Sequence, residues 1–197
     1  VVGVLDTTVP PQPAQVLLEV GGDLPIVNSL DAAPEANVLL IGIAPTGGSL
    51  PVPMRALVFA AIARGMDVES GLHDFLNDDA EFTAAAQASG AKLVDLRQNN
   101  ERDVAQRTGL REGCLRLHTV GHDCSVGKMV TAIELTRGLS AAGVDAKFIA
   151  TGQTGILVEG DGCPVDAVVA DFISGAVEKQ ILEHQHHRVL VVEGQGS

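Results

Sequence analysis

One segment of the chain has the residue spacing of a phosphate-binding loop. Residues 121–128 read Gly-His-Asp-Cys-Ser-Val-Gly-Lys, the pattern GxxxxGK, between an apolar run at 115–120 and a segment rich in Ala and Leu. Such a loop wraps backbone N–H groups around a phosphate at the positive end of a helix, and the lysine completes the neutralisation. The context favours a P-loop over a turn that only closes a βα unit. The expected phosphate-contacting residues are Gly121, His122, Asp123, Cys124, Ser125, Val126, Gly127, Lys128 and Met129.

The residue after the lysine departs from the usual pattern. P-loops that hold MgATP have Ser or Thr at this place, with the hydroxyl on Mg²⁺, whereas this chain has Met129. Thr131 stands two residues further along the expected helix and cannot take the same place. The sequence therefore argues against MgATP hydrolysis and predicts no metal site. It leaves the binding of a metal-free pyrophosphate, such as that of acetyl-CoA, as the expectation.

A second polar segment follows the next expected strand of the same region. Residues 150–155 read Ala-Thr-Gly-Gln-Thr-Gly. Loops at the carboxyl ends of parallel strands form the ligand crevice of an open sheet. Thr151, Gln153 and Thr154 are thus candidates for hydrogen bonds to a substrate carboxylate or a phosphate. The alternative is a glycine-rich turn whose threonines cap themselves.

An acidic residue ends the last apolar run, as in a Walker-B element. Val189–Val192 leads directly to Glu193, and glycines follow. Three roles stay open for Glu193: a metal ligand, a general base for a substrate amine, or a buried carboxylate that holds loops. Asp123 in the loop is the alternative base. A carboxylate beside phosphates is electrostatically costly, so Asp123 is expected to contact a cation, an amine or a backbone donor.

The histidines give weaker signals. His73 and Asp74 follow an expected strand, and His73 is a candidate acid or base at the substrate, although a structural or helix-capping pair is the commoner arrangement. Residues 44–48 end another strand and either line the same cleft or form a turn. His184, His186 and His187 beside Glu183 hint at a metal, but a solvated helix end is favoured.

These residues need an α/β scaffold to position them. Short β-rich runs alternate with helical patterns, which is typical of βαβ units around a parallel sheet. A polar stretch at 98–113 resembles an interdomain connection, so the domains are placed at 1–112 and 113–197. The expected strands are 1–5, 38–43, 66–68, 92–96, 115–120, 146–150 and 188–192, and the expected helices are 52–63, 79–88, 128–142 and 167–183.

Composition excludes several classes of function. A net charge of −12 and the absence of Trp and Tyr argue against nucleic acid as a partner. No apolar run approaches the roughly 20 residues of a membrane span. Three cysteines without CxxC spacing argue against a disulfide framework and fit the cytoplasm. The chain starts and stops inside or just past expected strands, so both ends read as truncated. Small-molecule substrates and a homo-oligomer are expected.

Several of these motifs together resemble one known family. The residues 119–129, 150–155, 165–172 and 192–196 are similar to a two-domain P-loop family, long labelled as of unknown function, that includes the DgcN-type D-glutamate N-acetyltransferases. Residues 41–48 and 70–76 resemble its Rossmann-like N-terminal domain. The likeness spans nearly the whole chain, and Met129 fits the family pattern. His122 stands where those members carry Thr, which leaves the role of this position open.

The resemblance implies a Rossmann-like domain followed by a P-loop domain with a mainly parallel sheet. It also implies transfer of an acetyl group from acetyl-CoA to the amine of D-glutamate or a related D-amino acid. Direct transfer is simpler than a covalent route through Cys124. The P-loop and the glutamate strand are also similar to those of dethiobiotin synthetase, so an ATP-dependent ligase or NTPase that uses Mg²⁺ is the alternative. A third hypothesis is a nucleotide- or CoA-binding protein without catalysis.

Overall fold

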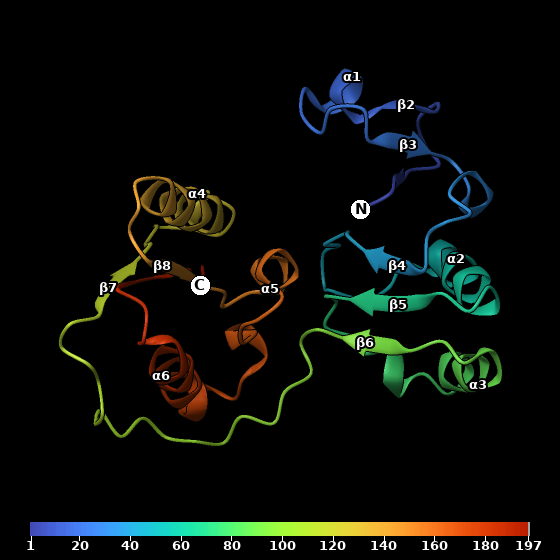
Figure 1. The fold of residues 1–197 in the computed structure, drawn as a ribbon. Helices are drawn as coiled ribbons and strands as arrows, with labels where there is room; N and C mark the ends of the chain where they lie inside the picture. Colours follow the sequence, from blue (N-terminus) through green and yellow to red (C-terminus); the bar gives the residue numbers. More distant parts are fainter. Residues whose placement is uncertain (197) are drawn as a thin grey trace. The chain divides into compact units, whose positions relative to one another are not determined.

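The computed structural model describes residues 1–196. The sheets formed by these residues have three strands each (Figure 1), in the orders β1-β3-β2, β4-β5-β6 and β7-β9-β8. The chain divides into two compact units. One unit comprises residues 1–70 and 74–94, and the other comprises residues 71–73 and the chain from Asp95 onward.

The first sheet is built from very short strands. β1 (Val4–Leu5) pairs in parallel with β3 (Pro25–Val27), which pairs in antiparallel fashion with β2 (Gln12–Pro13). The short helix α1 (Ala14–Leu18) follows β2 directly. The sequence predicted a strand over 1–5, of which only the last two residues pair, and it did not predict β2, β3 or α1. Strands of two or three residues are too short to show an alternating pattern.

The chain segment that forms the second sheet also contains the two helices predicted at 52–63 and 79–88. β4 (Val38–Ile41) pairs in parallel with β5 (Asp67–Ser70), and β6 (Leu93–Asp95) completes the order. Helix α2 spans Val52–Ala63, as predicted. Helix α3 spans Ala80–Ser89; it begins where the Asp79 side chain accepts hydrogen bonds from two backbone N–H groups and ends at Gly90, whose φ is 81°.

Contacts between α2 and α3 centre on one arginine. The guanidinium of Arg55 pairs with the Asp79 carboxylate at 2.5 Å and lies 4.4 Å from the centre of the Phe82 ring. Phe82 is buried, with 1% exposure, as are Val58 and Ile62 of α2. The helix cap at Asp79 and the packing of the two helices are therefore linked through a single side chain.

The third sheet is fully parallel and carries the P-loop. β9 (Val189–Val192) lies between β7 (Leu115–His118) and β8 (Ala146–Ile149). All four residues of β9 are buried, which is typical of a parallel strand covered on both faces. Helix α4 (Lys128–Ala141) packs on the core that includes Phe148 and Val191. Ile181 of helix α6 (Ile173–His184) packs on the core that includes Ile149 and Leu190.

Two predicted features of this unit need correction. The loop expected after β8 contains a helix, α5 (Gln153–Glu159), which ends at Gly160 with φ 79°. The helix expected over 167–183 begins only at Ile173. Before it the chain forms two 3₁₀ turns, Val165–Ala167 and Ala170–Phe172. Val168 has an extended backbone, with ψ 137°, so a continuous helix across this stretch is not possible.

Residues 97–113, called the strap below, run without helix or strand and belong to the second unit. The sequence placed them in the first domain or at its boundary. Their backbone is held by side chains of α6 and its end: the Glu178 carboxylate accepts from the N–H groups of Gln106 and Arg107, both at 2.6 Å, and Gln185 Oε1 accepts from Arg111 N at 2.6 Å. The strap has no helical or strand pattern, so nothing in the sequence indicated that it docks on α6.

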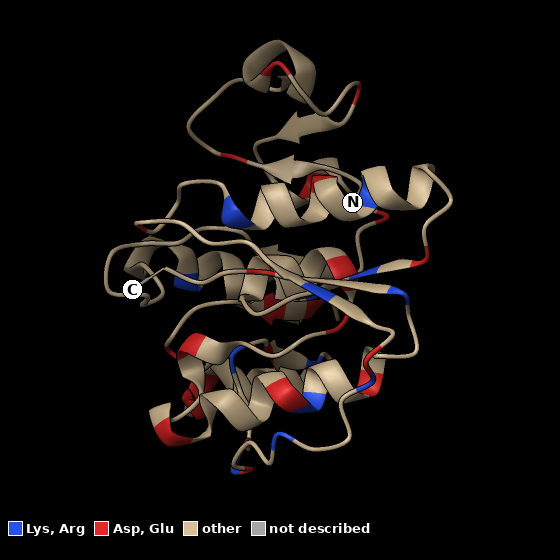
Figure 2. Cartoon of the chain, turned by 90° about the vertical axis from the view of Figure 1, so that its left-hand side faces the viewer, with Lys and Arg blue, Asp and Glu red and all other residues tan. Residues whose placement is uncertain are grey.

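Charge is spread widely over the molecule. Figure 2 shows acidic residues scattered over helices and loops, in keeping with the net charge of −12. Over residues 1–196, no helix combines the length and the apolar character that crossing a membrane requires.

Candidate functional site

The P-loop joins β7 to α4 with its lysine folded into the loop. Ser125 and Gly127 have φ values of 53° and 94°, and these left-handed residues turn the backbone just before the helix. Lys128 is the first residue of α4 and is only 8% exposed. Its Nζ donates to the carbonyl oxygen of Asp123 at 2.5 Å. The cation expected for phosphate neutralisation is thus enclosed by the loop that would hold the phosphate.

The neighbours of Lys128 within the loop differ in their surroundings. The Asp123 carboxylate accepts from Cys124 N at 2.7 Å, so it contacts a backbone donor, one of the three partners that the sequence suggested. Met129 is partly buried and packs against the core that includes Ala132 and Phe148. The position that carries a magnesium-binding hydroxyl in other P-loops is here an apolar side chain that belongs to the core of the sheet.

The glycine-rich segment after β9 lies beside the loop. Gly194 N donates to Thr119 Oγ1 at 3.0 Å. The approach is close enough that a Cβ on Gly194 would stand 1.8 Å from the Thr119 carbonyl oxygen. Gly196 lies against Cys124, whose Sγ would be 2.7 Å from a Cβ at that position. The structure therefore brings together the two motifs that the sequence identified separately.

Glu193 holds the turn that leads into α5. Its side chain is buried, and Oε2 accepts from Thr151 N at 2.9 Å and from Gly152 N at 3.2 Å. In return, Thr151 Oγ1 donates to the Glu193 carbonyl oxygen at 2.9 Å. Burial raises the pKa of Glu193, and the two backbone hydrogen bonds offset part of that rise. Glu193 therefore holds the turn at 151–152, which is one of the three roles left open by the sequence, and a role at the substrate stays a prediction.

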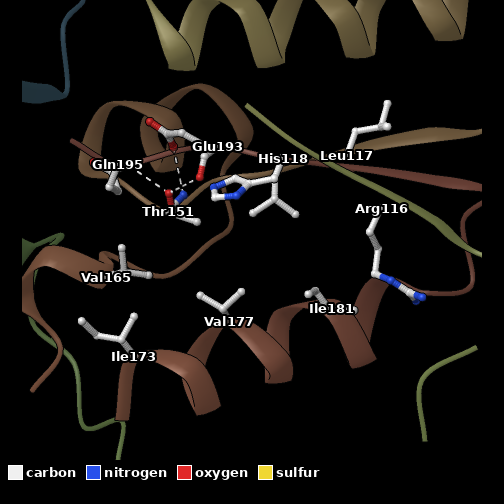
Figure 3. Close-up of a pocket in the computed structure, with 11 residues that line it drawn as sticks. Arg116, Leu117, His118, Thr151, Val165, Ile173, Val177, Ile181, Glu193 and Gln195 are labelled. Atoms are coloured by element: carbon white, nitrogen blue, oxygen red, sulfur yellow. Dashed lines mark hydrogen bonds between the residues drawn. The ribbon is translucent and has the colours of Figure 1, made fainter. Parts of the chain in front are cut away.

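A cavity of about 410 Å³ lies next to Glu193, between strands β7 and β9 and helix α6 (Figure 3). Ile173, Val177 and Ile181 of α6 form an apolar wall. At the polar end, the ring of His118 lies beside Thr151, together with Glu193 and Gln195. Gln195 Nε2 donates to Thr151 Oγ1 at 2.9 Å. Sequence reasoning missed His118, which is the last residue of β7 and one of two polar residues in that strand.

The other predicted substrate residues are distributed around the same turn. Gln153 is the first residue of α5 and is half-buried, whereas Thr154 is exposed. His73 is exposed, and the segment Gly71–His73 that contains it groups with this unit. A Cβ on Gly71 would come within 2.7 Å of Gln153 Cγ, so this segment lies directly on the start of α5.

Two of the histidines at the end of α6 pair with carboxylates. His184 Nε2 lies 2.8 Å from an Asp161 oxygen, and His187 Nδ1 lies 2.7 Å from an Asp145 oxygen. The hydrogen bond from His187 lowers the pKa of Asp145. Within residues 1–196, no group of three or more His, Cys, Asp or Glu side chains is arranged to hold a metal ion.

The turn at residues 44–48 closes on itself through Gly48 N and the Pro45 carbonyl at 2.9 Å.

A parallel α/β unit with a loop of this kind, preceded by a second α/β unit, defines a two-domain P-loop protein. The family models agree with this class. Residues 12–99 match the model described as "Domain of unknown function (DUF1611_N) Rossmann-like domain", and residues 103–197 match "Domain of unknown function (DUF1611_C) P-loop domain". The chain belongs to this family.

Known relatives give further detail. A protein of Tritonibacter scottomollicae named D-glutamate N-acetyltransferase is 42% identical over 166 residues, which is 82% of this chain and 48% of that protein. One of the same name from a Pseudoalteromonas species is 39% identical over 162 residues, again 82% of this chain and 48% of the relative. The chain therefore spans about half the length of these relatives.

A solved structure supports the same assignment. The crystal structure of a DUF1611 family protein from Anabaena variabilis matches with a TM-score of 0.92 and 38% sequence identity. The match covers 100% of this chain and 58% of the other.

Proposed function

We propose that this chain forms part of an enzyme that transfers an acetyl group from acetyl-CoA to the amine of D-glutamate or a related D-amino acid. The observation that carries the proposal is a P-loop with an enclosed lysine, Lys128, followed by a core-packed Met129 in place of a magnesium-binding hydroxyl. The names of the relatives supply the acceptor and the reaction.

The loop suits the diphosphate of coenzyme A. The backbone N–H groups of residues 121–128 would surround a phosphate, and Lys128 would exchange the Asp123 carbonyl for a phosphate oxygen. A diphosphate that is already part of coenzyme A needs no bond broken at phosphorus. Stabilisation of a γ-phosphoryl transition state by Mg²⁺ is then not required, and this fits an apolar residue at position 129.

The chemical step requires a base and donors for an oxyanion. In acyl transfer the amine attacks the thioester carbonyl, the C–N bond forms, the C–S bond breaks, and the thiol of coenzyme A leaves while a base takes the amine proton. We assign the base to Glu193, which lines the cavity and whose pKa is raised by burial above its ordinary value. Asp123 is the alternative base. Thr151, Gln153, Thr154 and His73 are assigned to the amino-acid substrate.

A thiol-release assay on the full-length protein tests the proposal. Acetyl-CoA is supplied in the presence of EDTA with D-glutamate, L-glutamate or another D-amino acid, and the Lys128→Ala variant serves as the control. We expect release with D-glutamate or a related D-amino acid, without added metal, and strongly reduced release at limiting acetyl-CoA in the variant. Release confined to reactions with MgATP, or ATP hydrolysis without acetylation of any amine, would contradict the proposal.

An ATP-dependent ligase is the second candidate, favoured by the acidic residue Glu193 directly after a strand beside the P-loop. Such an enzyme would have to bind Mg²⁺ without a hydroxyl at position 129. Parallel calorimetric titrations with acetyl-CoA and with MgATP separate the two functions. Tight binding of MgATP alone would select the ligase.

A further inference from the structure

A buried arginine at the start of the strap has partners on two sides. The Arg97 side chain is 7% exposed. Its Nε donates to the Gly71 carbonyl oxygen at 2.6 Å, and its Nη1 pairs with the Asp166 carboxylate. An arginine presents several donors in a fixed plane, so one side chain can hold two groups at a set separation. Removal of Arg97 would leave the partly exposed Asp166 carboxylate without this partner.

The Gly71 end of this arrangement lies on the candidate substrate residues. The backbone of Gly71 approaches Gln153 so closely that any side chain at position 71 would overlap the Gln153 side chain. Gln153 thus supports one side of Gly71 while Arg97 holds its carbonyl group. His73 is two residues further along the same segment.

The Asp166 end leads back to the same turn. Asp166 lies in the 3₁₀ turn Val165–Ala167, whose first residue donates from its backbone N to the Thr151 carbonyl oxygen at 2.9 Å. Asn99 Nδ2 donates to the Ala167 carbonyl oxygen at 3.1 Å and anchors the strap to the same 3₁₀ turn. A closed circuit of contacts results, from Thr151 through Val165, Asp166, Arg97 and Gly71 to Gln153.

We propose that Arg97 is a positioning residue, which seats the Gly71–His73 segment on the Thr151–Gln153 turn so that both contact the same amino-acid substrate. Glu193 holds this turn through Thr151 and Gly152, and Arg97 holds it through Gly71 and Asp166. Arg97 itself does not touch the substrate. The substrate part of this inference rests on the proposed function, whereas the positioning part does not.

The test compares Arg97→Met with Arg97→Lys in the full-length protein. Arg137→Met is the matched control, because Arg137 is 66% exposed and its ion pair is with Glu134 on its own helix. Hydrogen exchange is followed in peptides that cover residues 71–75 and 151–156. We expect Arg97→Met to speed exchange in both peptides by about 10-fold or more, because the variant loses hydrogen bonds made by a charged group. Arg97→Lys keeps a positive charge beside the Asp166 carboxylate, so we expect it to restore part of the protection.

Kinetics provide the second measurement. We expect Arg97→Met to raise KM for the amino acid by about 10-fold or more and to leave KM for acetyl-CoA within about twofold of the parent value. Equal changes in both constants would indicate general damage and would overturn the substrate part. Unchanged exchange in both peptides would overturn the positioning role whatever the activity.

The outcomes separate this inference from the proposed function. Faster exchange in a protein that acetylates no amine at all would support the positioning role and refute the acetyltransferase. If Arg97→Met does not fold, Arg97→Lys and Asp166→Asn carry the test, because each retains a hydrogen-bonding group at its position. Parent-like exchange in both of these variants would contradict the inference.

Discussion

The turn from β4 to α2 and the turn from β7 to α4 join the same kinds of element with different residues. Both follow a parallel strand, and both contain residues with left-handed backbone: Gly47 and Gly48, with φ of 84° and 72°, in one turn, and Ser125 and Gly127 in the other. Each turn delivers the chain to the N-terminus of a helix of 12 or 14 residues. Their backbone shapes alone therefore do not distinguish a binding loop from a connection.

The difference lies in the donors and the cation. Pro51 and Pro53 flank the first residue of α2 and have no N–H group, and that first residue is Val52, with 81% exposure. No proline interrupts the P-loop, and its first helical residue is Lys128, with 8% exposure. A strand–turn–helix unit becomes an anion site when free N–H groups and an inward cation are present, whereas the start of α2 has two prolines without N–H groups and an apolar first residue.

The largest effect is expected from the addition of a methyl group at Gly194, shortly after the end of β9. Gly194→Ala would place a carbon against the Thr119 carbonyl oxygen, which cannot move without disturbing the end of β7. We expect a loss of about 3 kcal/mol or more in the free energy of unfolding, measured by urea titration. Gly42→Ala, directly after β4, is the control, because no atom lies within 4 Å of a Cβ there. Equal losses in both variants would refute the close contact.

Phosphate binding should respond only to the lysine in the P-loop. Lys128→Ala is expected to weaken acetyl-CoA binding by about 10-fold or more, since a charge-assisted contact to phosphate contributes about 1.5–3 kcal/mol. Val52→Lys places the same cation at the first position of α2 and should bring no added affinity, because Pro51 and Pro53 supply no donors. Calorimetry measures both. Unchanged affinity in a folded Lys128→Ala protein would remove Lys128 from the site.

The smallest effect is an opposite dependence of stability on pH in the two units. The ion pair with Arg55 lowers the pKa of Asp79, so its stabilisation is present above the unfolded value of 3.8 and is lost as the pH falls through the lowered pKa. Burial raises the pKa of Glu193, so the unfolded chain releases this proton first. Ionisation of buried Glu193 therefore lowers the free energy of unfolding. This loss begins as the pH rises past the unfolded value of 4.5 and is complete above the raised pKa.

Asp79→Asn and Glu193→Gln separate these contributions. Urea titrations between about pH 3 and 7 give the free energy of unfolding of each variant relative to the parent. Relative to the parent, Asp79→Asn should become less stable as the pH rises, and Glu193→Gln should become more stable. The same sign for both variants would contradict the assigned pKa directions.

The sequence was most informative where local signals agree with the tertiary structure. Prolines followed by apolar residues at helical spacing predicted α2, and the glycine pattern with Lys128 predicted the P-loop fold and its helix. Asp79 and Gly90 marked the two ends of α3 in the sequence, because a side-chain cap and a left-handed glycine each depend on nearby residues alone. Each of these features is encoded within a few residues of where it acts.

The remaining features depend on contacts between distant residues. Helix α5 was missed because glycines at 152, 155 and 160 obscure a helix of seven residues. The contacts of Glu193 needed the turn at 151–152, 42 residues away, to be in place. The roles of Arg97 and His118 could not be read from spacing, because each becomes visible only when separate segments meet. The roles assigned to the site residues stay predictions.

The strap sets a limit on how this protein can change its length. Irregular surface segments usually accept insertions and deletions, since few partners depend on their spacing. In the strap, two adjacent N–H groups donate to the Glu178 carboxylate. The Gln185 side chain accepts from Arg111 N and donates to the Gly109 carbonyl. One added residue between Arg107 and Gly109 would carry the later groups about 3.5 Å past their acceptors. Residues can be exchanged along the strap more freely than they can be added or removed.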